Sequence, residues 1–170
     1  MNATLQTGAI TSFRGEYLFL SNYDQHEPFV WRNVEFTSGE QAFAYGKSLL
    51  APVKTKEWGD KVLMAATPGE AKKVGRSVPL NPDHWDTIKV QCMREITNAK
   101  FADVPEYAGR LMNTGARMLV EGNTWGDKFW GRCKEGDKWV GLNTLGVILM
   151  EQRGRWLLQA PPKEHKPLDF

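Results

Sequence analysis

Hydrophobic residues recur at helical spacing along most of the chain. The clearest case runs from Asn81 to about Phe101, where one apolar face is formed by Trp85, Ile88, Cys92, Ile96 and Ala99. Shorter patterns predict helices over about 37–50, 67–76, 105–115 and 145–158. We therefore expect a mainly α fold, a compact multihelical single domain rather than a bundle of long helices.

Two short runs of alternating residues precede the first helix. They extend from Phe29 to Phe36 on either side of Arg32-Asn33, a pair that suits a tight turn. This pattern predicts a small N-terminal β-hairpin. Little other strand is expected.

The segment Val120–Gly146 does not follow the helical pattern. It holds three tryptophans and four acidic residues interrupted by glycines, so it reads as a loop whose aromatic faces suit a flat ring attached to a sugar. Trp125 and Trp130 are placed to frame such a ligand, with Asp127 between them. The alternative is a glycine-rich surface turn held by buried tryptophans.

Composition limits the class of protein without identifying it. The chain of 170 residues, 41% hydrophobic and 25% charged, suits one domain over residues 1–160, with a proline-rich, charged and flexible tail over 161–170. A net charge of +2 gives no strong case for nucleic-acid binding. The scattered histidines and the absence of a C-x-x-C motif predict no metal and no cofactor.

The same features predict a cytoplasmic protein. The start of the chain lacks the pattern of a signal peptide, and no apolar run is long enough for a membrane span. Cys92 and Cys133 are then expected to be reduced thiols. We expect a monomer or a weak dimer with no membrane contact.

Glu40 and Lys47 lie seven residues apart, which places both on one face of the first helix with Phe43 between them. A carboxylate and an amine on one face can act as acid or base and as nucleophile. The structural alternative is equally simple: Glu40 completes a capping box with Thr37, and Lys47 is a solvated charge near the helix end.

Phe43, between Glu40 and Lys47, is a candidate substrate-binding residue, and three other residues are candidate ligand-binding groups. Asn22 lies in the loop segment L-S-N-Y. Its side chain either binds a ligand hydroxyl or only stabilises a local turn. Trp85, in the first turn of the long helix, is a stacking platform or a core residue. Asn143 is a substrate-binding residue or the cap of the last helix.

Several short blocks, taken in order, resemble the YbiA/NADAR family of N-glycosidases over about Phe13 to Arg153. The blocks are L-S-N-Y at Leu20–Tyr23, S-G-E-Q-A-F-A-Y-G-K at Ser38–Lys47, P-G-E-A-K-K-V-G-R at Pro68–Arg76, L-V-E at Leu119–Glu121, F-W-G at Phe129–Gly131 and G-L-N-T-L-G-V-I-L-M-E-Q-R from Gly141 to Arg153. The first helix departs from the usual family pattern E-H-Y-F-Q-A-Q-K, because Gln41-Ala42 replace His-Tyr and Tyr45-Gly46 replace Ala-Gln.

The resemblance implies hydrolysis of a C1–N bond between ribose and a base-like nitrogen. Its two associated substrate types are ADP-ribose attached to guanine in DNA, where the enzyme opposes a DNA ADP-ribosyltransferase toxin, and phosphoribosylamino-pyrimidine intermediates of the riboflavin pathway. We favour modified guanine as the substrate. A non-catalytic ADP-ribose-binding module and a structural interaction protein that uses exposed tryptophans are the alternatives.

The resemblance also assigns roles. Glu40 and Lys47 match the family's functional carboxylate and lysine, while Asp127 and Trp130 match its acidic position and tryptophan. We expect Glu40 to transfer the proton and Asp127 to bind ribose hydroxyls or assist water. Lys47 offers a second route, in which its amine forms a Schiff base with an opened ribose. Trp85, Trp125 and Trp130 are expected to stack on the base or on adenine.

Overall fold

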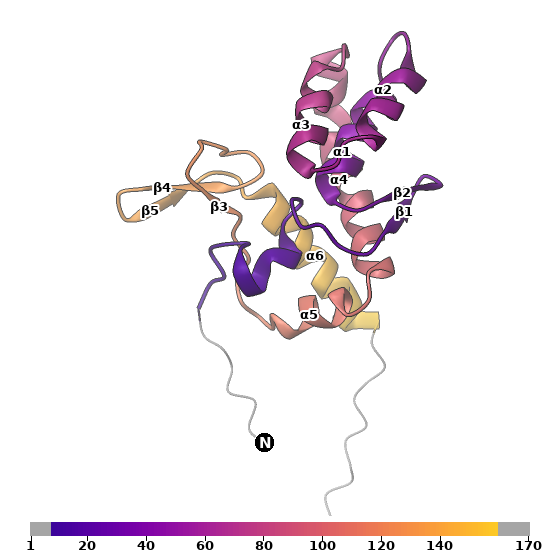
Figure 1. Cartoon of the computed structure of the whole chain (residues 1–170). Coiled ribbons are helices and arrows are strands. Elements are labelled where there is room, and N and C mark those ends of the chain that lie inside the picture. Colours follow the sequence, from indigo (N-terminus) through magenta and orange to yellow (C-terminus); the bar gives the residue numbers. More distant parts are fainter. Residues whose placement is uncertain (1–7, 160–170) are drawn as a thin grey trace, which may run out of the picture.

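The computed structural model describes residues 8–159 and shows a mainly helical chain, as the sequence pattern predicts (Figure 1). In chain order the elements are η1 (Gly15–Leu20), β1 (Phe29–Trp31), β2 (Val34–Phe36), α1 (Gly39–Ser48), α2 (Thr55–Leu63), α3 (Pro68–Ser77), α4 (Pro82–Asp103), α5 (Tyr107–Asn113), β3 (Gly122–Asn123), β4 (Arg132–Glu135), β5 (Lys138–Val140) and α6 (Thr144–Gln159). The predicted tail over 161–170 lies outside the described residues.

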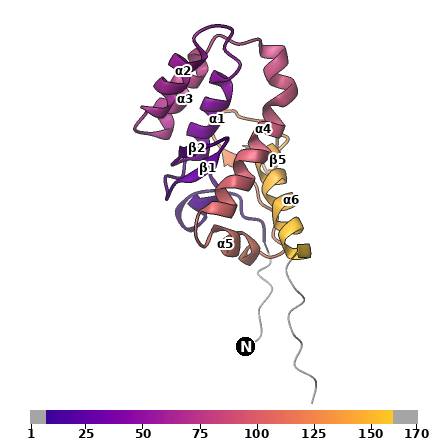
Figure 2. The same ribbon diagram turned by 90° about the vertical axis from the view of Figure 1, so that its right-hand side faces the viewer.

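The long helix α4 links two groups of helices. At one end it packs against α1, which in turn contacts α2 and α3, and further along it packs against α5 and α6 (Figure 2). The main hydrophobic core lies between these elements and includes Phe36, Ile96, Leu111 and Ile148, all with no exposed surface. No helix within residues 8–159 is long and apolar enough to cross a membrane.

The predicted long helix and hairpin are confirmed. Asn81 caps α4 by accepting hydrogen bonds from the amides of Asp83 and His84. In the hairpin, Arg32 and Asn33 both have positive φ angles, 53° and 62°. These angles are those of the tight turn that joins strands without splaying them.

Two parts of the fold differ from the sequence-based expectation. Helix α2 was not predicted from the sequence. It begins after Lys54, whose backbone is left-handed and whose side chain makes no capping hydrogen bond, and its interior contains Gly59. The segment Val120–Gly146 is not a simple loop, since β3 pairs in parallel with β4, and β4 pairs antiparallel with β5. These strands are too short to show an alternating pattern.

Helices α1 and α3 approach each other closely where Gly75 faces Ala44. A Cβ atom added at Gly75 would lie 2.9 Å from the Ala44 Cβ atom and 3.1 Å from its Cα atom. The same addition at Gly69, in the first turn of α3, would meet only the Thr67 Oγ1 atom, at 3.9 Å. Close packing of α1 on α3 thus depends on Gly75.

We therefore expect Gly75→Ala to lower the free energy of unfolding by about 1–3 kcal/mol, because a methyl group there overpacks the α1–α3 contact. Gly69→Ala is the matched control and should be neutral or stabilise by up to about 1 kcal/mol, because alanine favours helix. Urea unfolding of both variants measures the difference. Equal effects at the two positions would contradict the proposed close contact.

Candidate active site

A cavity of about 930 Å³ lies where α1, α3, the segment around η1 and the loop after Val120 meet. Its polar lining contains both acidic and basic groups, and its apolar lining is largely aromatic. The residues that matter for its chemistry are Arg14, Asn22, Glu40, Phe43, Lys47, Lys72, Arg76, Glu121, Trp125, Asp127 and Trp130. Seven of these residues were predicted from the sequence as site residues. The other four are Glu121 and the cations Arg14, Lys72 and Arg76.

Glu40 enters this cavity from the first turn of α1. The helix is capped by Ser38, whose Oγ atom accepts from the Gln41 amide, while the Gln41 Oε1 atom accepts from the Thr37 amide. Gln41 therefore occupies the capping-box position, and the Glu40 side chain takes no part in the cap. Burial raises the pKa of Glu40, and nearby Lys72 and Lys47 oppose that increase.

Lys47 enters the same cavity two turns later along α1. Its Nζ atom lies 5.7 Å from the centre of the Phe43 ring and 5.6 Å from that of Trp85. Burial lowers the pKa of Lys47; the charge of Glu40 opposes this, and Arg76 and Lys72 add to it. Desolvation thus shifts the carboxyl and the amine in opposite directions, towards their neutral forms.

Asp127 lines the cavity and also organises its wall. The Asp127 Oδ1 atom accepts from the amides of Phe129 (3.0 Å) and Trp130 (2.9 Å). The Asp127 backbone is held by both side-chain polar atoms of Asn123. These bonds fix the direction in which the chain presents Trp130.

The predicted aromatic residues take different positions. Trp130 packs edge to face on Phe43, with ring centres 5.3 Å apart, and both rings line the cavity. Trp125 is 59% exposed at the rim. Trp85 is buried behind Phe43, at 5.0 Å between ring centres, and is not part of the lining.

Asn22 and Asn143 also differ in position. Asn22 lines the cavity, and its backbone carbonyl oxygen accepts a hydrogen bond from the Glu40 backbone amide at 2.9 Å. Asn143 is buried outside the lining; its side chain accepts from the Glu121 amide (2.9 Å) and donates to the Leu119 carbonyl (2.8 Å). Asn143 thus supports the segment that carries Glu121.

Glu121 is a cavity residue to which the sequence analysis assigned no role. Burial raises its pKa to about 7; Asp127 adds to that increase and Arg14 opposes it. Among the described residues, no group hydrogen-bonds its buried Oε2 atom. In the sequence, the only indication that Glu121 belongs to the site was its position in the L-V-E block. The same holds for Lys72 and Arg76, which lie in the P-G-E-A-K-K-V-G-R block.

The departures from the usual family pattern in α1 point away from the cavity. Gln41 donates to the carbonyls of Val62 and Leu63 in α2. Gly46 faces Cys92 and Trp31, where a Cβ atom would lie 2.8 Å from the cysteine sulfur. Neither residue lines the cavity, so these replacements adapt α1 to its neighbouring elements.

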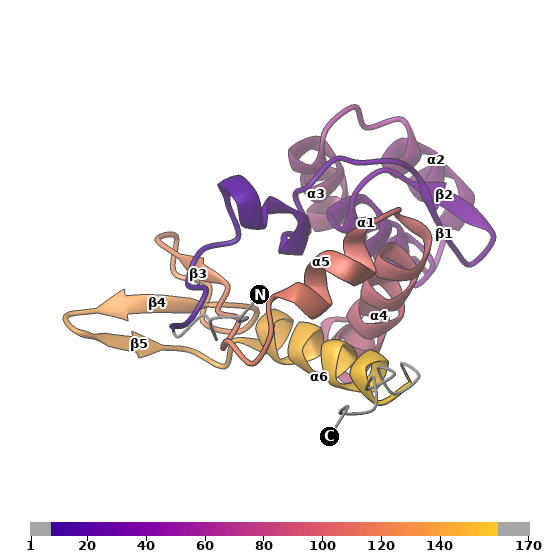
Figure 3. The same ribbon diagram turned by 90° about the horizontal axis from the view of Figure 1, so that it is seen from below.

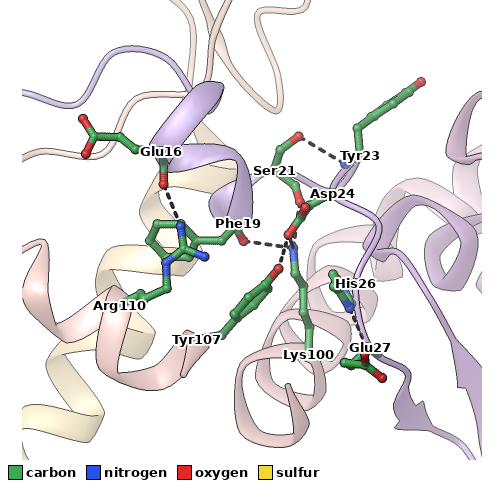
Figure 4. A network of polar contacts seen from close by, with 10 residues as sticks. All are labelled: Glu16, Phe19, Ser21, Tyr23, Asp24, His26, Glu27, Lys100, Tyr107 and Arg110. Carbon is green, nitrogen blue, oxygen red and sulfur yellow. Dashed lines mark hydrogen bonds and ion pairs between the residues drawn. The ribbon is translucent and has the colours of Figure 1, made fainter. Parts of the chain in front are cut away.

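A buried polar network holds the segment that carries Asn22 (Figure 4). The Lys100 Nζ atom, on α4, donates to the carbonyls of Phe19 (3.0 Å) and Ser21 (2.8 Å) and lies 4.0 Å from Asp24. Tyr107 donates to the same Asp24 carboxylate. Burial lowers the pKa of Lys100 to about 7, and Asp24 opposes this shift.

The described residues contain no group of three or more His, Cys, Asp or Glu side chains arranged to hold a metal ion. The ionisable groups that line the cavity include the Glu40 carboxyl and the Lys47 amine. A helical domain that places such groups beneath aromatic rings has the features of an enzyme that acts on a nucleotide-like ligand.

The family model for the NADAR domain matches residues 10–156, and the chain belongs to this family. It is 35% identical over 144 residues to an N-glycosidase of Nostoc punctiforme, covering 81% of this chain and 84% of that protein. It is also similar to the NMR structure of the Escherichia coli protein YbiA, with a TM-score of 0.72, 26% identity, and coverage of 95% of this chain and 90% of that one.

A further relative is the chloroplastic riboflavin biosynthesis protein PYRR of Arabidopsis thaliana. The identity is 34% over 103 residues, 58% of this chain, and the match spans 16% of that much longer protein. The predicted family, the mainly helical fold and the class of enzyme, N-glycosidase, are confirmed by these comparisons. The substrate and the residue roles remain predictions.

The Lys100 network provides a test of how the site is supported. We expect Lys100→Met to lower the free energy of unfolding by about 3–5 kcal/mol, because it leaves the buried Asp24 carboxylate without its cation. Adding Asp24→Asn should restore part of this loss. Lys73→Met, at an exposed position on α3, should change stability by less than about 0.5 kcal/mol.

Denaturant unfolding measures all of these variants. A Lys100→Met protein as stable as the Lys73→Met control would show that the network does not hold the segment around Asn22.

Proposed function

We propose that this protein hydrolyses the C1–N bond between ADP-ribose and guanine in DNA. The observation that carries the proposal is that one cavity contains a carboxyl group with a raised pKa and an amine with a lowered pKa, at Glu40 and Lys47. Cleavage of a glycosylamine requires a proton for the leaving nitrogen and stabilisation of positive charge at C1. Glu40 can serve both requirements, and Lys47 offers a covalent alternative from the same cavity.

Glu40 is our candidate for the proton transfer. Its raised pKa keeps more of the carboxyl protonated near neutral pH, as a general acid requires. The proton passes to the leaving nitrogen as the C1–N bond breaks, and the resulting carboxylate can then stabilise positive charge on the ribose. Asn22 and Asp127, on the cavity wall, are our candidates for binding ribose hydroxyls.

Lys47 supports a second route to the same products. Ring opening of the ribosylamine gives an imine at C1, and the neutral Lys47 amine adds to that carbon and displaces the base amine, which leaves a lysine Schiff base. Water then hydrolyses the Schiff base and releases the sugar. The lowered pKa of Lys47 provides the neutral amine that this exchange needs.

The cavity also suits the remainder of ADP-ribose. Lys72 and Arg76 line it and provide positive charge for a diphosphate. Trp125, 59% exposed at the rim, offers a face on which a base can stack. The volume of about 930 Å³ lies near the upper end of the usual range for ligand sites, roughly 300–1,000 Å³.

A second candidate substrate is a phosphoribosylamino-pyrimidine of the riboflavin pathway, favoured by the similarity to PYRR. It contains the same type of C1–N bond and a phosphate. A non-catalytic ADP-ribose-binding module is less well supported, because binding alone does not require Glu40 and Lys47 together in the cavity.

Incubating the protein in parallel with ADP-ribosylated DNA and with the phosphoribosylamino-pyrimidine distinguishes these functions. Release of ADP-ribose from the DNA, detected by mass spectrometry, is the expected result. Sugar release from the pyrimidine alone would favour the second candidate, and binding without release would favour the binding module.

Replacing the carboxyl group tests the role of Glu40. Glu40→Gln should still bind ADP-ribose but lose at least about 100-fold in kcat, because the amide cannot supply the proton. Glu57→Gln, at an exposed position on α2, is the control and should match the wild type in single-turnover assays. Full activity of Glu40→Gln would overturn the assigned role.

Borohydride reduction during turnover tests the Schiff base. We expect a covalent sugar adduct that peptide mapping places on Lys47, and no adduct in Lys47→Arg. The control Lys73→Arg, on an exposed face of α3, should give the adduct. Absence of an adduct from the wild type, together with an active Lys47→Arg protein, would eliminate this route and leave direct hydrolysis.

A further inference from the structure

A second hollow of about 670 Å³ adjoins the candidate active site. It lies between the segment before η1, the turn after β3 and the β4–β5 hairpin. Arg14, Gly122 and Gly126 line both this hollow and the active-site cavity. A ligand can therefore extend from one to the other.

The β4–β5 hairpin forms the outer wall of this hollow and projects away from the helices (Figures 1 and 3). All three residues of β5 are exposed. Neither Trp139 nor Val140 belongs to the described hydrophobic core clusters. Packing of the core therefore does not explain an aromatic residue at this position.

Trp139 is placed against the shared wall of the two hollows. A Cβ atom added at Gly122 would lie 3.0 Å from the Trp139 Cη2 atom and 2.1 Å from the Thr11 carbonyl oxygen. Glycine at 122 thus allows the ring to lie directly on the backbone, while 37% of Trp139 remains exposed. An indole held in this way is a platform for stacking.

Positive charge surrounds the platform. Arg14, Lys128 and Lys134 line the hollow, and Glu135 is its one acidic lining residue. Glu135 forms an ion pair with Lys128 at 2.5 Å. Within residues 8–159, Arg14 and Lys134 form no ion pair, which leaves both charges available for phosphate.

We propose that this hollow binds the nucleotide next to the modified guanine on a single DNA strand. Its base stacks on Trp139, and its phosphate lies between Arg14 and Lys134. This inference rests on the proposed function, since it assumes that the substrate is a strand. The adenosine diphosphate of ADP-ribose is the less suitable occupant, because the active-site cavity already offers it Lys72, Arg76 and Trp125.

Binding of a fluorescein-labelled, unmodified single-stranded hexanucleotide, followed by anisotropy at low salt, tests the hollow without relying on catalysis. Trp139→Ala should weaken binding on the order of 10-fold, the loss expected for one stacked base. Lys134→Gln should reduce the slope of log K against log salt by about 0.7, as expected for one lost phosphate contact on a single strand. The controls Leu142→Ala and Lys138→Gln, exposed residues outside the hollow, should bind as the wild type does.

Hydrolysis separates this inference from the proposed function. Trp139→Ala should lower kcat/KM on an ADP-ribosylated oligonucleotide about 10-fold and leave kcat/KM on ADP-ribosylguanosine unchanged. Equal losses on both substrates would place the adenosine end of ADP-ribose in the hollow and overturn the inference. It is also overturned if the wild type does not bind the hexanucleotide, or if Trp139→Ala binds it normally.

If the hexanucleotide binds through Trp139 but ADP-ribosylated DNA is not hydrolysed, the inference stands as a strand-binding site. In that case it is the proposed function that fails.

Discussion

Removal of water from around Glu40 and Lys47 is the condition on which the chemistry of this site depends. In water the carboxyl would be almost fully ionised at neutral pH and the amine almost fully protonated, and neither could act as proposed. Burial shifts both pKa values towards neutrality, although each group's charge favours the charged form of the other. The burial depends on aromatic packing: the Lys47 amine lies beside the rings of Phe43 and Trp85, and Trp130 packs against Phe43.

That packing is assembled from segments far apart in the sequence. Helix α1 carries both reacting groups, the segment around Asn22 covers its first turn, and the loop that contains Asp127 presents Trp130 from the other side. Lys100 connects the second of these segments to α4 through buried hydrogen bonds. The positions of the site residues therefore depend on the contacts between α4, α1 and the N-terminal segment.

Local sequence patterns predicted the parts of this arrangement that depend on residues close together in the chain. The cap at Asn81, the turn at Arg32-Asn33 and the shared face of Glu40 and Lys47 all follow from spacing and local hydrogen bonding. Helix α2 was missed because Gly59 and the uncapped Lys54 lower its local helical tendency, whereas packing of Val62 against α1 and α3 stabilises it. Glu121 was not assigned a role because its burial arises only when distant segments meet, and Asn143 supports that segment through contacts that spacing does not reveal.

The most direct test of this account is an NMR titration of the protein with ¹³C-labelled glutamate and lysine side chains, assigned with Glu40→Gln and Lys47→Arg. The account predicts that the pKa of Glu40 lies above the ordinary glutamate value of about 4.3 and that of Lys47 below the ordinary lysine value of about 10.4. Ordinary values for both groups would show that the site is open to water, and would contradict the claim that desolvation prepares it for catalysis.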